Sequence, residues 1–210
     1  MDTYLEPHME TSALIIVDTQ NDFSLESGAA VIPQTSLFIP EMVKLLKAFR
    51  RRKRLIIHMV RLYSEDGSNA DICRKKIIES GKTIVAPGSV GAEPVTELKP
   101  DPKVKLDSQL LLSGQPQGIG PKEFIIYKPR WGAFFQTPLE DLLADYHIDT
   151  LVFAGCNFPN CPRTSIYQAS ERDFRIIAVT DAVSQIYEKG IEELSGIGVM
   201  TLTADETIQL

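Results

Sequence analysis

Six short apolar runs, separated by segments of helical or loop character, constrain the fold more than any other feature of this chain. Each run is continuous rather than alternating, as is typical of strands buried on both faces of a parallel sheet. Strands that alternate with helices form such a sheet with helices on both sides. The sequence therefore predicts a three-layer α/β/α fold with a mostly parallel sheet. The predicted strands are 12–17, 55–60, 123–127, 150–154, 174–179 and 198–202.

The helices are predicted from apolar spacing and capping residues. Apolar side chains recur at helical spacing over 41–52 and again from Leu139 to Tyr146, where Thr137 is the expected N-cap. A further helix is predicted at 163–173, and the last helix around 190–195. We expect these helices to cover both faces of the sheet.

A chain of 210 residues buries one sizeable core, so a single domain over 1–210 is expected. Between residues 63 and 122 the periodicity weakens and prolines accumulate, apart from a short helix near 71–80. A long irregular segment inside one domain is usually functional. We therefore expect 63–122 to be a lid or a wall of the site.

Charge and composition exclude several classes of partner. The net charge of −6 argues against nucleic acid or an anionic membrane as the main partner. The polar, acidic start is unlike a signal peptide, no apolar run is long enough to span a bilayer, and three cysteines do not suggest a disulfide framework. The expected location is the cytoplasm, with Cys73 and Cys156 as small buried apolar residues. The three histidines are scattered, so neither a metal nor another cofactor is expected.

Reactive side chains follow three of the predicted strands. Asp18 and Lys128 come directly after theirs, and Cys161 falls where a loop becomes a helix, with Asn160 as the expected N-cap. The carboxyl ends of parallel strands meet at one edge of the sheet, where ligands bind. A helix start and an ammonium favour a thiolate, and a carboxylate can take up its proton. The alternatives at this point are a buried apolar cysteine and an aspartate that caps a turn.

Four blocks carry a resemblance to a known family: LIIVDTQNDF at 14–23, PGSVGAEPVTELKP at 87–100, YKPRWGAFFQTPLEDLL at 127–143 and AGCNFPNCPRTS at 154–165. In this order they resemble the isochorismatase-like cysteine hydrolases. The resemblance implies a six-stranded parallel sheet and a catalytic triad of Asp18, Lys128 and Cys161. It also implies a cis peptide at Cys156-Asn157, an oxyanion hole from the backbone N–H groups of Asn157 and Cys161, and assembly as a homodimer or homotetramer. Two residues, Pro162 and Asn157, depart from the family pattern. The shape of the acyl pocket therefore does not follow from the resemblance.

Sequence differences within that family indicate the branch. The nicotinamidases carry a metal-binding Asp-x-His pair after the second strand, which is absent from His58 to Tyr63, and the vinyl ether hydrolases lack the cysteine. The block from Lys128 to Phe134 most resembles the ureido and carbamoyl amidases. The expected activity is a hydrolase that cleaves a C–N bond of a small amide or N-carbamoyl compound through a thioester and releases ammonia. An isochorismatase-type vinyl ether hydrolase, a non-catalytic binding protein and a redox protein using Cys156 and Cys161 remain alternatives.

Polar and aromatic side chains near these motifs are the candidates for substrate binding. Two arginines could hold a substrate carboxylate through a bidentate pair, or could form surface salt bridges instead. The aromatic residues could form the walls of a pocket or fill the core. The candidates are Gln20, Phe23, Arg61, Arg130, Trp131, Phe134, Phe158 and Asn160.

Overall fold

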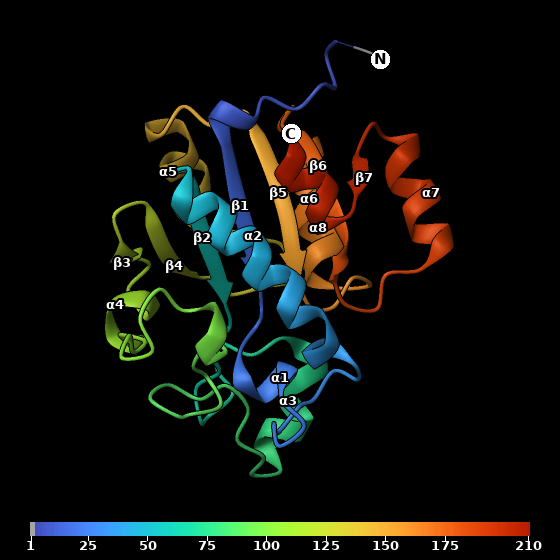
Figure 1. Ribbon diagram of the computed structural model, residues 1–210. Helices are drawn as coiled ribbons and strands as arrows, with labels where there is room; N and C mark the ends of the chain where they lie inside the picture. Colours follow the sequence, from blue (N-terminus) through green and yellow to red (C-terminus); the bar gives the residue numbers. More distant parts are fainter. Residues whose placement is uncertain (1–2) are drawn as a thin grey trace.

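A seven-stranded sheet forms the centre of the computed structural model, which describes residues 3–210 (Figure 1). The strand order is β3-β4-β2-β1-β5-β6-β7, and every neighbouring pair is parallel except β3 with β4. The strands are β1 (Ser12–Val17), β2 (Leu55–Val60), β3 (Gln117–Gly120), β4 (Glu123–Tyr127), β5 (Thr150–Gly155), β6 (Arg175–Val183) and β7 (Met200–Leu202). The predicted α/β/α architecture is confirmed, with one more strand than expected.

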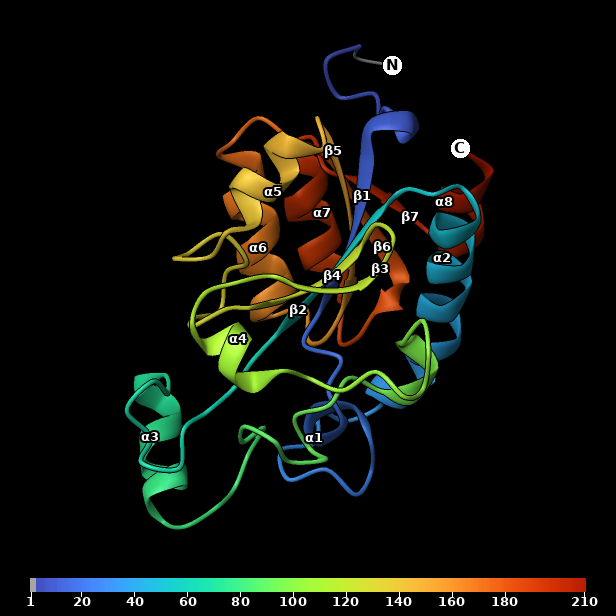
Figure 2. The ribbon, with the colours of Figure 1, turned by 90° about the vertical axis from the view of Figure 1, so that its left-hand side faces the viewer.

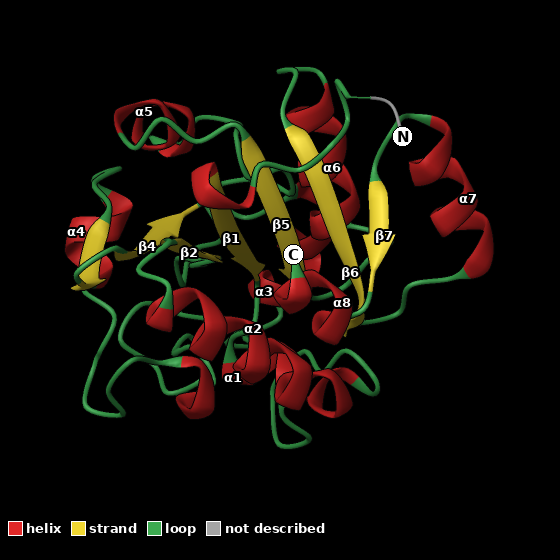
Figure 3. Cartoon of the chain, turned by 45° about the horizontal axis from the view of Figure 1, so that its top comes forward, coloured by secondary structure: helices red, strands yellow, loops and turns green. Residues whose placement is uncertain are grey.

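Helices cover both faces of the sheet, as Figures 2 and 3 show from two further directions. On one face lie α5 (Leu139–Asp145), α6 (Cys161–Ser170) and α7 (Glu188–Gly196), and on the other lie α2 (Ile39–Arg51) and α8 (Ala204–Gln209). Three short helices, α1 (Asn21–Ser24), α3 (Ile72–Glu79) and α4 (Ser108–Leu112), belong to the connections. The sheet is therefore shielded from water on both sides.

The central strand β1 supplies both halves of the core. Ile15 and Val17 pack on the α5–α6–α7 side, while Leu14 and Ile16 pack on the α2–α8 side. Successive side chains of a strand point to opposite faces, so a strand covered on both sides must be apolar throughout. This explains why the runs in the sequence are continuous.

Four strands end at the same level of the sheet. The pairing of Val17 with Met59 and Gly155, and of Val60 with Tyr127, aligns the residues that follow these strands. α1 and α3 lie beyond this carboxyl edge, below the strand arrows in Figure 1. A third apolar cluster, which includes Phe23, Leu62 and Ile84, packs there.

Residues 91–95 pair with the segment that follows β1. The N–H of Asn21 donates to Glu93 O at 2.9 Å, that of Asp22 to Gly91 O at 3.0 Å, and that of Val95 to Thr19 O at 3.0 Å. The 63–122 segment thus lies against the residues next to Asp18.

Some local predictions need correction. β3 and α8 are absent from the sequence-based assignment, and α6 begins at Cys161 rather than at residue 163. Pro138, not Thr137, occupies the N-cap position of α5, and the Thr137 hydroxyl donates to Ala133 O at 2.5 Å. Cys73 is exposed, so its expected burial is wrong, whereas Cys156 is buried. No helix in residues 3–210 is long and apolar enough to cross a membrane.

Candidate active site

A buried ion pair joins the ends of β1 and β4. Lys128 Nζ donates to Asp18 Oδ2 at 2.8 Å, and the Lys128 side chain is fully buried. The second carboxylate oxygen, Asp18 Oδ1, is also buried and has no hydrogen-bond partner among residues 3–210. A buried carboxylate with one unused oxygen is an acceptor available for chemistry.

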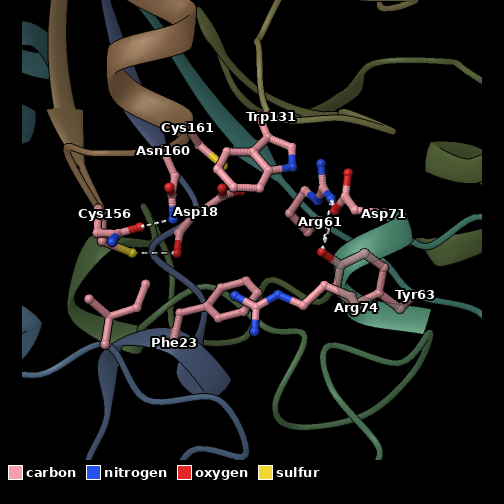
Figure 4. A pocket seen from close by; sticks show the side chains of 12 residues that line it. Asp18, Phe23, Arg61, Tyr63, Asp71, Arg74, Trp131, Cys156, Asn160 and Cys161 are labelled. Carbon is pink, nitrogen blue, oxygen red and sulfur yellow. Dashed lines mark hydrogen bonds and ion pairs between the residues drawn. The ribbon is translucent and has the colours of Figure 1, made fainter. Parts of the chain in front are cut away.

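Cys161 is the first residue of α6 and lies beside this carboxylate in the same pocket (Figure 4). Asn160 occupies the N-cap position, as predicted, but its side chain does not cap the helix. Asn160 Nδ2 donates instead to Asn157 Oδ1 at 3.2 Å, and Asn157 Nδ2 donates to Gln185 Oε1 at 2.8 Å. These two amides fix the loop that presents the thiol.

The thiol of Cys161 is protonated at neutral pH. Burial is the largest cause that raises its pKa to about 12, and the Asp18 carboxylate adds to it, while Lys128 and Arg61 act in the opposite direction. The sequence predicts that the ammonium would favour a thiolate, but that charge is already neutralised by Asp18 at 2.8 Å. Thiolate formation therefore requires transfer of the proton to a base, and Asp18 is the adjacent one.

Two backbone N–H groups of the same loop are available to a ligand. The N–H groups of Asn157 and Cys161 donate to no acceptor within residues 3–210, and both residues line the pocket. The N–H of Cys161 belongs to the first turn of α6, where intrahelical acceptors are lacking. This is the arrangement that an oxyanion needs.

The end of β5 is held close to β1. The peptide bond between Cys156 and Asn157 is cis, as the resemblance implies, and the Cys156 thiol donates to Asp18 O at 2.9 Å. Gly155 has φ +120°, and a Cβ there would lie 2.2 Å from Val17 O. Only glycine fits this close approach of the two strands.

The pocket at this edge is small and has a mixed lining. Its volume is about 40 Å³, which corresponds to a few water molecules. Figure 4 shows its side chains converging from the ends of β1, β2 and β5, from α6 and from α3. The lining residues are Asp18, Phe23, Ile32, Arg61, Tyr63, Asp71, Arg74, Trp131, Cys156, Asn157, Asn160 and Cys161.

Both arginines predicted to hold a carboxylate have protein partners. Arg61 lines the pocket, but it is buried, forms an ion pair with Asp71 and donates to the Tyr63 hydroxyl at 2.8 Å. Arg130 is exposed, does not line the pocket, and donates to Asn69 O at 3.1 Å and Pro129 O at 2.7 Å. The structure therefore places Arg130 outside the site.

Three other candidates for substrate binding also lie outside the pocket lining. Gln20 is fully buried and its amide bonds to Arg61 N, Arg61 O and Ala92 O, each at 2.7 Å. Phe134 packs against Phe174, and Phe158 against Tyr187, in the core beside α5–α7. By contrast, Phe23, Trp131 and Asn160 line the pocket.

Most of the pocket residues that sequence reasoning missed come from the segment after β2. Tyr63, Asp71 and Arg74 lie in a stretch without clear periodicity, and Ile32 belongs to the loop that follows α1. The only signal in the sequence was that 63–122 is too long and irregular for a passive connection. Within residues 3–210, no three His, Cys, Asp or Glu side chains gather in a way that could hold a metal ion.

Comparisons with known proteins agree with this architecture. The chain is 28% identical over 201 residues to a probable inactive nicotinamidase of Arabidopsis thaliana, with 93% of each chain covered. It is 24% identical to the ureidoacrylate amidohydrolase RutB of Methylorubrum extorquens, covering 88% of this chain and 74% of the relative. The crystal structure of an isochorismatase family protein from Desulfovibrio vulgaris superposes with a TM-score of 0.80 at 28% identity, covering 95% of this chain and 99% of that one.

The family model described as the isochorismatase domain matches residues 12–107 and 108–206. The two matched stretches include β1 and β4, which Asp18 and Lys128 directly follow, and α6, which begins at Cys161. The chain belongs to the isochorismatase family of hydrolases.

Proposed function

We propose that this protein is a cysteine amidohydrolase that cleaves a C–N bond of a small primary amide or N-carbamoyl compound and releases ammonia. The observation that carries the proposal is the unused oxygen of Asp18. Lys128 occupies one oxygen of this carboxylate at 2.8 Å, and the other has no partner within residues 3–210 while a protonated thiol lies beside it. The ureidoacrylate amidohydrolase among the relatives supports this choice of reaction.

Acylation begins with transfer of the Cys161 proton to Asp18. As the S–H bond breaks, the sulfur attacks the carbonyl carbon, and the N–H groups of Asn157 and Cys161 donate to the oxygen that becomes negative. When the tetrahedral intermediate collapses, Asp18 gives its proton to the departing nitrogen. Ammonia leaves, and the acyl group remains on the sulfur as a thioester.

Deacylation uses the same groups with water as the nucleophile. Asp18 takes a proton from water, the hydroxide attacks the thioester carbon, and the sulfur leaves with the proton returned by Asp18. Lys128 holds the carboxylate in position in both steps, because its Nζ donates to Asp18 Oδ2 at 2.8 Å.

A second candidate function is a binding protein without turnover. One relative is described as a probable inactive nicotinamidase, which motivates this alternative. The presence of Cys161 beside the buried ion pair of Asp18 and Lys128 favours the hydrolase, because a site with no chemistry has no need of a buried ion pair next to a thiol.

An ammonia-release screen over small primary amides and N-carbamoyl compounds tests the proposal. We expect turnover by the unchanged protein, none by Cys161→Ala, and full turnover by Cys73→Ala, which removes an exposed thiol outside the pocket. Hydroxylamine should trap the acyl group, and mass spectrometry should locate the intermediate on Cys161. Turnover that persists in Cys161→Ala would show that the thiol is not the nucleophile.

A further inference from the structure

One cation in the pocket has no partner in the protein. Arg74 lies on α3, is half-buried and lines the pocket, and its side chain takes part in no hydrogen bond or ion pair within residues 3–210. Figure 4 shows the side chain extending along the pocket from α3 toward the side on which Phe23 lies. A half-buried guanidinium that faces a cavity without a counter-ion is available to an anionic ligand.

The charges of the pocket leave Arg74 in excess. Asp18 is neutralised by Lys128 and Asp71 by Arg61, so each acid of the lining already has a basic partner. Arg74 then adds one positive charge that no residue in the described chain balances. The pocket is thus electrostatically complementary to a ligand with one negative charge.

Arg61 is unsuited to the same task. Its Nη2 pairs with Asp71 and donates to the Tyr63 hydroxyl, while Nη1 has no partner within residues 3–210, and the Arg61 side chain is only 3% exposed. Binding a substrate carboxylate there would place a second anion beside Asp71 or break a buried pair, and both cost free energy. Arg74 meets neither obstacle.

The remaining walls limit the size and shape of the ligand. Trp131 lies beside the thiol and Phe23 beside the end of the Arg74 side chain (Figure 4), and the cavity volume is about 40 Å³. A short hydrocarbon linker fits such walls, whereas a bulky substituent does not.

We propose that Arg74 binds a carboxylate of the substrate, and that the preferred substrates are therefore small amides or N-carbamoyl compounds with a carboxylate at the end remote from the bond that is cleaved. This inference rests on the proposed amidohydrolase function and specifies its substrate class. The planar guanidinium forms two parallel N–H···O bonds with a carboxylate, so it fixes the orientation of the substrate as well as its charge.

Two pairs of substrates that differ mainly in the carboxylate test the inference: succinamate with butyramide, and N-carbamoyl-β-alanine with propylurea. In Arg74→Gln we expect the KM for the carboxylates to rise by roughly 30-fold with kcat little changed, because a charge-assisted bidentate contact is lost. The neutral compounds should be unaffected, and Arg74→Lys should retain part of the preference. Lys75→Gln is the matched control, since it removes the same charge from an exposed neighbour on α3 that does not line the pocket. Its effect should stay below about twofold.

Binding of succinate to the Cys161→Ala variant gives a readout that does not need turnover. Calorimetry should show weaker binding when Arg74→Gln is added and no change when Lys75→Gln is added. If Arg74→Gln leaves succinate binding and the preference for carboxylates unchanged, Arg74 is not the anchor and the inference is overturned, even where amides are cleaved. If succinate binding depends on Arg74 but no amide is turned over, the anion site stands and the amidohydrolase function fails.

Discussion

Two buried carboxylates, at opposite ends of the strands of the sheet, differ in the number of hydrogen bonds that they accept. Glu123 begins β4 and accepts bonds from Arg50 Nε at 2.8 Å, Arg50 Nη2 at 2.7 Å and His58 Nε2 at 2.7 Å. Asp18 follows β1 at the carboxyl edge and receives one such bond, from Lys128, which leaves Oδ1 unpaired within residues 3–210. Both carboxylate oxygens of Glu123 accept hydrogen bonds, whereas Asp18 has one oxygen that could accept a proton.

The difference separates a carboxylate with all its hydrogen bonds made from one with an unpaired oxygen. Burial opposes ionisation of Glu123, but the hydrogen bonds from Arg50 and His58 outweigh it and lower its pKa to about 2. At the other site the shifted pKa is that of Cys161, next to Asp18: burial and the Asp18 carboxylate together raise it to about 12. A fully bonded acid stabilises the fold, and a partly bonded acid beside a thiol is placed to exchange a proton.

The largest effect is expected from Asp18→Asn, which removes the proposed base but keeps the shape of the side chain. Turnover should fall by about 10³-fold or more, because thiolate formation loses its acceptor. The matched control is Asp22→Asn, at a nearby buried aspartate whose oxygens accept only backbone N–H groups, from Ala29 at 3.1 Å and Val85 at 2.6 Å. Asp22→Asn should reduce stability rather than kcat. Equal losses of kcat in the two variants would contradict the special role of Asp18.

The Glu123→Gln variant should have the converse outcome. We expect a loss of about 3 kcal/mol or more in the free energy of unfolding, because a buried ion pair loses one partner. The kcat should remain unchanged, since Glu123 does not line the pocket. Denaturant unfolding measures the loss, with Glu192→Gln as the control, because Glu192 forms an exposed pair with Lys189. That control should stay within about 0.5 kcal/mol; a similar loss in both variants would mean that the Glu123 cluster is not stabilising.

Acidification should reduce the stability difference between the unchanged protein and Glu123→Gln. The folded-state pKa of Glu123 is lowered from 4.5 to about 2, so its contribution is present above pH 4.5 and is lost as the pH falls toward 2. The shift corresponds to about 3 kcal/mol. Unfolding free energies at pH 7, 4.5 and 3 measure the difference, which should be largest at neutral pH. A difference that grows on acidification would reverse the assigned sign.

A further prediction concerns the rate at which iodoacetamide alkylates Cys161 in a Cys73→Ser background. Because burial and Asp18 raise the pKa of Cys161 to about 12, the rate should rise about tenfold per pH unit from pH 7 to 10 without levelling. At a fixed pH the Asp18→Asn variant should react faster, since one cause of the raised pKa is removed. A rate that is constant over this range would indicate a resting thiolate, which the sequence alone predicts.

Much of the fold follows from local pattern. β1, β2 and β4 are continuous apolar runs, and their predicted bounds match the structure. β3 is not predicted, because Gln117–Gly120 contains two glycines and no apolar run. Only its pairing with β4 makes it a strand. α8 begins with a capping box between Thr203 and Glu206, a signal present in the sequence and overlooked.

Part of the candidate site could likewise be predicted from local sequence, and part could not. Asp18, Lys128 and Cys161 could be brought together in advance because each follows a strand or opens a helix whose place in a parallel sheet is known. The partners of Arg61 could not be predicted, since Asp71 reaches it only after the irregular segment folds back across the sheet edge. Trp131 and Phe134 lie in one turn, but only the folded turn shows that one lines the pocket and the other packs in the core.

The buried amide of Gln20 has a consequence for how a substrate reaches the thiol. The Gln20 side chain bonds both to Arg61, at the end of β2, and to Ala92, so these two points are tied together. Any movement of the chain between them is confined to a loop with both ends fixed, which contains α3. Arg74, the residue proposed to select the substrate, lies in this loop.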